Sequence, residues 1–123
     1  MKLINSAPRY KAIGPYSQAV LAGGLLFSSG VIGVNAEGTL VEGLEAQLME
    51  IFENMKAILA QANMEYKHIA KTTIFLANMD DYAELNALYA QVFSIHHPAR
   101  SAVQVAKLPK GALVEIEFVA SKE

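Results

Sequence analysis

Arginine occurs at only two positions in this 123-residue sequence, Arg9 and Arg100. Arg100 follows residues 96–99 (HHPA), a segment that predicts a loop leading into a strand. A guanidinium placed there can present its planar fork to a carboxylate or a phosphate. An ordinary surface cation gives the same pattern, and the residues alone favour that simpler interpretation.

Two glutamates, Glu115 and Glu117, share one face of a predicted strand near the end of the sequence. Their neighbours on that face, Leu113 and Val119, are apolar. A carboxylate in a partly apolar environment can have a raised pKa and can serve as a general acid or base. A polar strand facing solvent, or a salt bridge between subunits, explains the pattern equally well, so both interpretations stay open.

The remaining polar residues give weaker signals. His96 and His97 are adjacent and diverge in an extended segment, His68 is remote, and no metal-binding motif is present, so no metal site is expected. Residues 28–30 (SSG) lack the G-x-S-x-G pattern of a serine nucleophile and predict a strand end where the backbone approaches another group closely. Tyr16 either supplies a phenol to a pocket or packs on the core. The absence of cysteine excludes disulfides and thiol chemistry.

Composition limits the classes of protein to which this chain can belong. Hydrophobic residues make up 53% and charged residues 18% of the sequence, which excludes intrinsic disorder and predicts one folded domain over residues 1–123. The net charge of −2 provides no basic surface of the kind that nucleic-acid binding requires. No apolar stretch is long enough to span a bilayer, so we expect a cytoplasmic protein.

Two amphipathic helices are expected to position these residues. The first carries an apolar stripe with helical spacing, formed by Leu44, Leu48, Ile51, Phe52, Met55, Ile58 and Leu59. The second begins near residues 80–81, where Asp81 and Glu84 have capping-box spacing, and Pro98 stops it. Its apolar stripe is formed by Tyr82, Leu85, Leu88, Tyr89, Val92 and Phe93.

Short strands separated by turn signals make up the rest of the chain. We predict strands at about residues 17–21, 25–29, 70–76, 102–107 and 113–121, with 31–34 as further extended chain. Residues 22–24 (AGG) join the first two strands as a hairpin. The order predicts an α+β domain with two helices on one sheet. The other sheet face also carries apolar residues, which predicts its burial against another subunit.

Four segments together carry a family resemblance that covers residues 13–120. They read GPYSQAV at 14–20, FSSG at 27–30, KTTIFLANMDDYAELNALYAQVF at 71–93 and PARSAVQVAKLPKGALVEIE at 98–117. In these segments the chain resembles the RidA (YjgF) family of small enamine/imine deaminases. The resemblance implies a chorismate-mutase-like fold, a mixed β-sheet with two helices on one face. It also implies a homotrimer whose sheets line a barrel-like core, with sites in the clefts between subunits.

The activity that the resemblance implies is hydrolysis of 2-aminoacrylate, 2-aminocrotonate and related imines to 2-keto acids and ammonia. Pyridoxal-phosphate-dependent dehydratases release these reactive species, and the deaminase removes them without a cofactor or a metal. The partner expected at the subunit interfaces is therefore a small 2-imino or 2-keto carboxylate. No membrane or nucleic-acid partner is expected.

The resemblance also assigns roles to individual residues. Arg100 grips the substrate carboxylate, and Glu115 orients the attacking water or acts as its general base. The pocket is lined by Tyr16, Ser29 and Asn86, and backbone groups near Ala102 contact the imine nitrogen.

Three positions depart from the common family pattern. Val31 and Gly33 stand where many members have glutamine and proline, and Ala102 stands where several have cysteine. These differences leave the substrate range open.

Two other functions remain as alternatives to the deaminase. A non-catalytic carboxylate-sensing or chaperone-like protein would use the same clefts without turnover. An endoribonuclease or translation inhibitor, a role attributed to some relatives, ranks behind it because the chain lacks a basic surface interleaved with aromatic residues.

Overall fold

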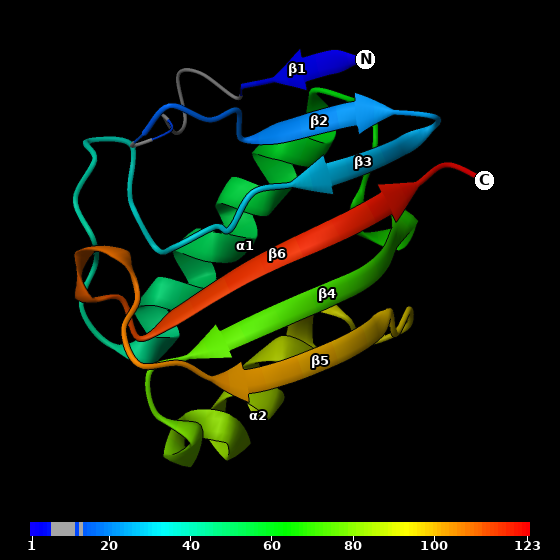
Figure 1. Ribbon diagram of the computed structural model, residues 1–123. Coiled ribbons are helices and arrows are strands. Elements are labelled where there is room, and N and C mark those ends of the chain that lie inside the picture. Colours follow the sequence, from blue (N-terminus) through cyan, green and yellow to red (C-terminus); the bar gives the residue numbers. More distant parts are fainter. Residues whose placement is uncertain (6–11, 13) are drawn as a thin grey trace.

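A six-stranded mixed sheet carries the fold (Figure 1). The computed structural model describes residues 1–5, 12 and 14–123 of the chain. The strands are β1 (Lys2–Ile4), β2 (Ala19–Ala22), β3 (Leu25–Ser28), β4 (Ile69–Leu76), β5 (Ala99–Gln104) and β6 (Val114–Ser121). Within the described residues they lie in the order β1-β2-β3-β6-β4-β5. The pair β4 and β5 is parallel, and the other neighbouring pairs are antiparallel.

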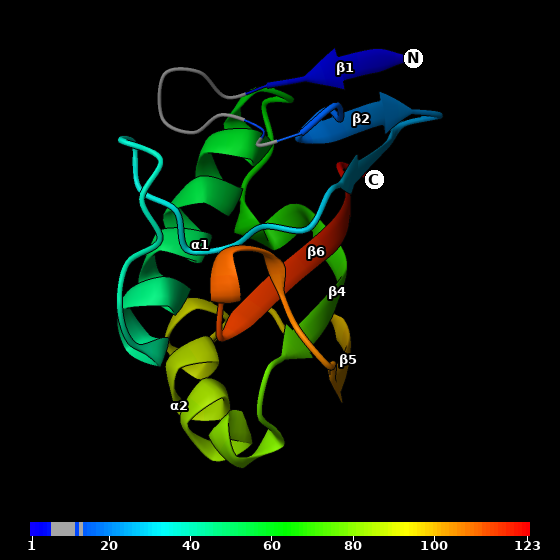
Figure 2. The ribbon, with the colours of Figure 1, turned by 60° about the vertical axis from the view of Figure 1, so that its left-hand side comes forward.

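Both helices, α1 (Leu44–Ala60) and α2 (Tyr82–Val92), cover the same face of this sheet (Figure 2). All seven apolar residues of the stripe predicted for the first helix are buried. They share one core with the inward residues of β6, which are Val114, Ile116, Phe118 and Ala120. The predicted α+β architecture, with two helices on one sheet, is confirmed. Neither helix in the described part of the chain is long and apolar enough to cross a membrane.

The start of α2 differs from the predicted capping box. Asp81 has helical backbone angles (φ −80°, ψ −1°), and its side chain makes no capping hydrogen bond. A capping side chain needs a more extended backbone to reach back to the first helical amides. Asn78 takes this role instead, since its Oδ1 accepts a hydrogen bond of 2.9 Å from Asp80 N at the start of the 3₁₀ turn Met79–Asp81.

The strand that carries Arg100 begins earlier than predicted. β5 spans Ala99–Gln104 rather than 102–107, so Arg100 lies inside a strand and not in the loop before it. The parallel ladder with β4 runs from Lys71 opposite Ala99 to Leu76 opposite Gln104. This pairing starts directly after Pro98, whereas the alternation of apolar residues starts only at 102. The sheet therefore fixes the direction of the Arg100 side chain.

The other predicted strands agree with the structure to within two residues at either end. The hairpin between β2 and β3 is confirmed, and Gly23 and Gly24 both have positive φ angles there (59° and 78°). Segment 31–34 forms two isolated bridges rather than a strand, pairing Val31 with Ile116 and Val34 with Leu40. The sequence did not predict β1, which is only three residues long.

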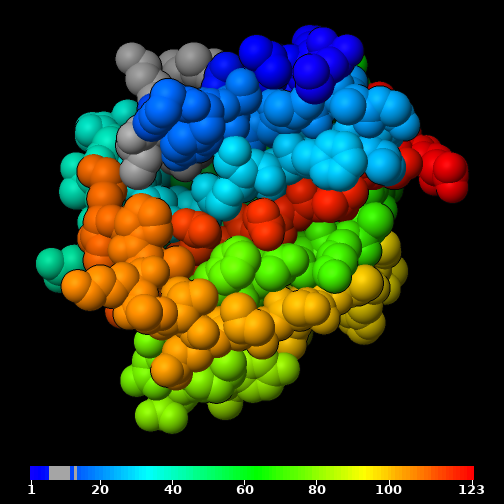
Figure 3. All heavy atoms as spheres, viewed as in Figure 1, coloured from blue at the N-terminus to red at the C-terminus, as the bar shows by residue number. Residues whose placement is uncertain are grey.

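The sheet face away from the helices is open in the single chain (Figure 3). Large apolar side chains are exposed on it. By strand register this open face includes Leu3, Phe27 and Val103, which are 63%, 44% and 44% exposed. Glu115 and Glu117 lie among them and are half-buried. The open face thus mixes apolar and charged side chains and is not covered within one chain.

Candidate active site

Arg100 points from β5 toward α2, on the helix-covered side of the sheet. Its Nη2 donates a hydrogen bond of 2.9 Å to the Tyr82 hydroxyl. The guanidinium carbon lies 5.5 Å from the centre of the Tyr82 ring and 5.0 Å from the centre of the Tyr89 ring. Both distances are in the range of cation–π contacts. Because Arg100 is half-buried, these contacts act in a partly desolvated environment.

A cavity of about 300 Å³ adjoins Arg100. Its lining residues are Asn86, Tyr89, Ala90, Phe93, His97, Pro98 and Arg100. Two of the residues expected at the site, Asn86 and Arg100, therefore face one cavity. Mostly apolar walls with a few polar groups are typical of small-molecule sites.

Tyr89 connects this cavity to the buried core. Its hydroxyl shares a hydrogen bond of 2.8 Å with Oγ1 of the buried Thr72 on β4. Its ring packs against Phe93 and Phe52, with centroid distances of 4.6 Å and 6.3 Å. Burial raises the pKa of Tyr89, and the Thr72 hydrogen bond and the Arg100 charge oppose that shift. Tyr89 therefore presents a fixed aromatic surface to Arg100.

Glu115 leaves β6 on the open face of the sheet, opposite Phe75 of β4. It lies against Gly30, where a Cβ would come within 2.6 Å of Glu115 Cδ. Burial raises the pKa of the Glu115 carboxyl group, and the negative charge of Glu117 adds to the shift. The close approach predicted for residues 28–30 is confirmed, and the Glu115 side chain is its cause.

Hydrogen bonds hold the loop after β3 beside β6, near Glu115. Ser29 Oγ donates to the Ser17 carbonyl at 2.7 Å, which ties the segment containing Tyr16 to the same place. Val31 exchanges two backbone hydrogen bonds with β6, of 2.8 Å and 3.0 Å. Tyr16 is 39% exposed and directly precedes Ser17. Ser29 and the Tyr16 segment therefore belong to the Glu115 side of the molecule.

The positions that depart from the family pattern face the interior. Val31 is 1% exposed and belongs to the core. Gly33 lies against α1, where a Cβ would come within 2.6 Å of Gln47 Cα. Ala102 is half-buried and packs against the core from the same side of β5 as Arg100. These residues therefore act on packing and on the course of the loop, and none of them lines the cavity beside Arg100.

The expected catalytic pair does not meet within one chain. Arg100 and Glu115 lie on the two strands that flank β4, and their side chains leave opposite faces of the sheet. We call the first group the arginine half-site, formed by Arg100, Tyr82, Tyr89 and Asn86. The second group is the glutamate half-site, formed by Glu115, Gly30 and Ser29. The residues of each half-site contact one another within one chain, but a single chain does not bring the two half-sites together.

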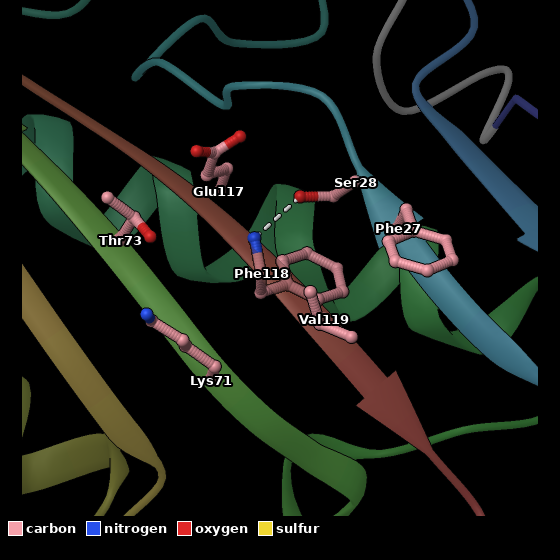
Figure 4. Close-up of a pocket in the computed structure, with 7 residues that line it drawn as sticks. All are labelled: Phe27, Ser28, Lys71, Thr73, Glu117, Phe118 and Val119. Atoms are coloured by element: carbon pink, nitrogen blue, oxygen red, sulfur yellow. Dashed lines mark hydrogen bonds between the residues drawn. The ribbon is translucent and has the colours of Figure 1, made fainter.

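A second cavity, of about 340 Å³, opens on the open face (Figure 4). It is lined by Phe27, Ser28, Lys71, Thr73, Glu117, Phe118 and Val119. Ser28 Oγ accepts a hydrogen bond from Phe118 N (Figure 4). The bond is 2.8 Å long and replaces strand pairing where β3 ends. Glu117 belongs to this cavity, whereas Glu115 belongs to the glutamate half-site. Nowhere in the described part of the chain do three His, Asp or Glu residues group as metal ligands.

Sequence reasoning missed two residues beside Arg100. Tyr82 was assigned to the apolar stripe of α2, yet it is 39% exposed and its hydroxyl contacts the guanidinium. His97 was considered only as a metal ligand, and although exposed it lines the arginine cavity. The seven-residue spacing of Tyr82 and Tyr89 was an available signal, because it places both rings on one helix face.

Comparison with known proteins decides the family. The family model described as endoribonuclease L-PSP matches residues 5–122. The chain belongs to the RidA (YjgF) family. A RutC family protein of Pyrococcus horikoshii is 44% identical over 115 residues, which cover 92% of this chain and 91% of that protein.

Two other proteins similar to this RidA family member have more specific descriptions. The human 2-iminobutanoate/2-iminopropanoate deaminase is 42% identical over 121 residues, covering 97% of this chain and 88% of that protein. The structure of Escherichia coli TdcF with bound serine has a TM-score of 0.93 at 38% identity, and the match covers all of both chains. The resemblance inferred from sequence, and the α+β fold of this family, are confirmed.

Proposed function

We propose that this protein hydrolyses small 2-imino acids, and their enamine tautomers such as 2-aminoacrylate and 2-aminocrotonate, to 2-keto acids and ammonia. The observation that carries the proposal is Arg100, a half-buried guanidinium at the edge of a 300 Å³ cavity. Every substrate of this kind has a carboxylate beside the reacting carbon. The description of the human relative, a deaminase of 2-iminobutanoate and 2-iminopropanoate, supports the same reaction.

Arg100 would bind the substrate carboxylate through paired, charge-assisted hydrogen bonds. The guanidinium uses one donor for Tyr82, and its remaining N–H groups can form the fork that a carboxylate needs. Binding at this point places the imine carbon at a set distance from the protein and neutralises the substrate charge. Backbone groups near Ala102 are suited to the imine nitrogen because β5 is the outermost strand of the described sheet.

Glu115 would handle the proton of the attacking water. Its carboxylate takes one proton while the water oxygen bonds to the carbon of the protonated imine, which gives a neutral carbinolamine. The carboxylic acid then returns that proton to nitrogen, and the C–N bond breaks with its electron pair on nitrogen. The hydroxyl proton passes to the departing ammonia, so a 2-keto acid and ammonium leave. The raised pKa of Glu115 suits both directions of this transfer.

A second copy of the chain would bring the two half-sites together. The open face exposes Leu3, Phe27 and Val103, and burial between copies would remove this apolar area from water. A closed cyclic assembly repeats one contact around its axis. We therefore propose a homotrimer in which the arginine half-site of one chain faces the glutamate half-site of the next chain.

The test is keto-acid release from an imine generated in situ from a small amino acid, with semicarbazide to trap the imine that escapes. We expect faster keto-acid formation and less trapped imine with the wild type, and neither effect with Arg100→Ala. Lys56→Ala, which removes an exposed cation on α1 outside both half-sites, is the matched control and should behave as the wild type. No acceleration by the wild type with any amino acid would overturn the deaminase.

Two outcomes would support other functions. Calorimetric binding of 2-oxobutanoate without any acceleration of imine hydrolysis would indicate a carboxylate-binding protein that uses the same arginine. The family description also names an endoribonuclease. RNA cleavage together with a steep dependence of RNA affinity on salt concentration would support that activity, because phosphate contacts release counterions.

A further inference from the structure

The Tyr82 hydroxyl accepts a hydrogen bond from Nη2 of Arg100. We infer that Tyr82 is a positioning residue, which holds the guanidinium in the direction that receives a ligand carboxylate. The inference rests on the proposed role of Arg100 as the carboxylate-binding group. It goes beyond that role because it names a residue that acts through Arg100 and not on the substrate.

The two tyrosines that contact Arg100 differ in how firmly they are held. Tyr89 is buried, hydrogen-bonded to Thr72 and packed against Phe93. Tyr82 lies two helical turns earlier on the same face of α2 and is 39% exposed. The Tyr89 ring therefore supplies a fixed surface under the guanidinium. Rotation of the guanidinium over that surface is limited by the hydrogen bond to Tyr82.

The geometry of this hydrogen bond leaves the guanidinium free to bind a carboxylate through two parallel N–H groups. Tyr82 accepts from Nη2 alone, at 2.9 Å. A second N–H on Nη2 and those of the other guanidinium nitrogens stay available for a ligand. An arginine side chain loses considerable rotamer freedom when it binds. Restricting that freedom before the ligand arrives lowers the entropy lost on binding, so Tyr82 should strengthen carboxylate affinity without taking part in proton transfer.

Tyr82→Phe tests the hydroxyl because it keeps the aromatic ring over the guanidinium. We expect KM for the imine and the dissociation constant of 2-oxobutanoate to rise about threefold to tenfold, with kcat unchanged, which is the size of effect that loss of one ordinary hydrogen bond has. In an Arg100→Lys background the same substitution should add nothing, because Tyr82 acts through the guanidinium. An equal additional loss in that background would assign Tyr82 a separate structural role and overturn the inference.

A measurement without ligand separates this inference from the proposed reaction. With only two arginines in the sequence, the Nε–H region of a nitrogen-15 spectrum holds two signals, and Arg100→Lys identifies that of residue 100. Relaxation should show restricted motion of this group in the wild type and greater motion in Tyr82→Phe. Tyr66→Phe removes a hydroxyl that donates to the Phe52 carbonyl, outside both half-sites, and should leave the signal unchanged.

The outcomes remain distinct. Equal restriction of Arg100 in the wild type and Tyr82→Phe would overturn the inference, whether or not the protein turns over an imine. Greater mobility without any loss of 2-oxobutanoate affinity would also overturn it, because the orientation would then not matter for the ligand. Greater mobility with weaker binding, in a protein that hydrolyses no imine, would support the inference and contradict the deaminase.

Discussion

Arg100 and Glu115 lie on the strands that flank β4, yet their surroundings are built in different ways. Arg100 lies against two aromatic rings, and one of them, Tyr89, is anchored in the core through Thr72. Glu115 lies against the backbone of Gly30, in a loop that hydrogen bonds hold beside β6. The first half-site depends on side-chain packing, and the second depends on the absence of a side chain.

The two half-sites act on their charged groups in different ways. Aromatic surfaces and a hydroxyl contact the guanidinium of Arg100 and attract its positive charge. Burial and a neighbouring carboxylate disfavour the charged form of Glu115 and raise its pKa. A fixed cation and a carboxyl group that exchanges its proton readily are what the binding and hydrolysis of an imino acid require.

The largest expected effect tests whether the two half-sites come from different chains. Arg100→Ala and Glu115→Gln should each abolish turnover as pure proteins. If both are unfolded and refolded together in equal amounts, about a quarter of the sites in a cyclic assembly combine an intact arginine with an intact glutamate from the next chain. Activity should therefore return to about a quarter of the wild-type value, measured as keto-acid release. A mixture as inactive as its components would contradict a site shared between chains.

The next effect compares two glycines of the same loop. Gly30→Ala places a methyl group against the flexible Glu115 side chain, so it should lower kcat about tenfold or more with a stability loss below about 1 kcal/mol. Gly33→Ala places the methyl group against the backbone of α1 at Gln47, so it should cost about 1–3 kcal/mol and leave kcat nearly unchanged. Urea unfolding and steady-state kinetics on both variants measure the contrast. Equal effects of the two substitutions on kcat would show that Gly30 has no special role in the glutamate half-site.

A smaller effect concerns the anchor of the arginine half-site. Tyr89→Phe leaves the buried Thr72 hydroxyl without its partner and should lower the free energy of unfolding by about 1–2 kcal/mol. Adding Thr72→Val removes the unpaired hydroxyl, so the double variant should be more stable than the sum of the single losses predicts. Strict additivity in urea unfolding would show that the hydrogen bond does not couple α2 to β4.

Local periodicity predicted α1 well, and long-range pairing explains where prediction failed. The stripe from Leu44 to Leu59 repeats within one segment, and every member of it is buried. The position of Arg100 depends on parallel pairing with β4, which lies on the other side of α2 in the sequence. No local pattern marks the start of such a strand, so the sequence placed Arg100 in a loop.

At the candidate site, the sequence proposed individual residues but could not predict their arrangement in space. The apolar neighbours of Glu115 lie on the same strand, so the sequence could offer a raised pKa as one of two open interpretations, and burial does raise that pKa. The contact between Arg100 and Tyr82 joins residues 18 positions apart, and it depends on how α2 packs on β5. That the two half-sites leave opposite faces follows from the register of three strands, which composition and spacing do not encode.

The smallest effect is the pH dependence of stability at Glu115. The folded-state pKa of Glu115 is raised, so the folded chain holds this proton more tightly than the unfolded chain does. The free energy of unfolding of the wild type should therefore fall as pH rises from the ordinary pKa of a glutamate to the raised value. Glu115→Gln cannot titrate, so it should gain stability relative to the wild type across that window and keep the gain at neutral pH.

Urea unfolding at fixed protein concentration measures the free energy of unfolding of both proteins against pH, with a variant at an exposed position, Glu37→Gln, as the baseline. A constant difference at every pH would mean that the carboxyl group is solvated as in the unfolded chain, and the contrast between the half-sites would then lie in geometry alone.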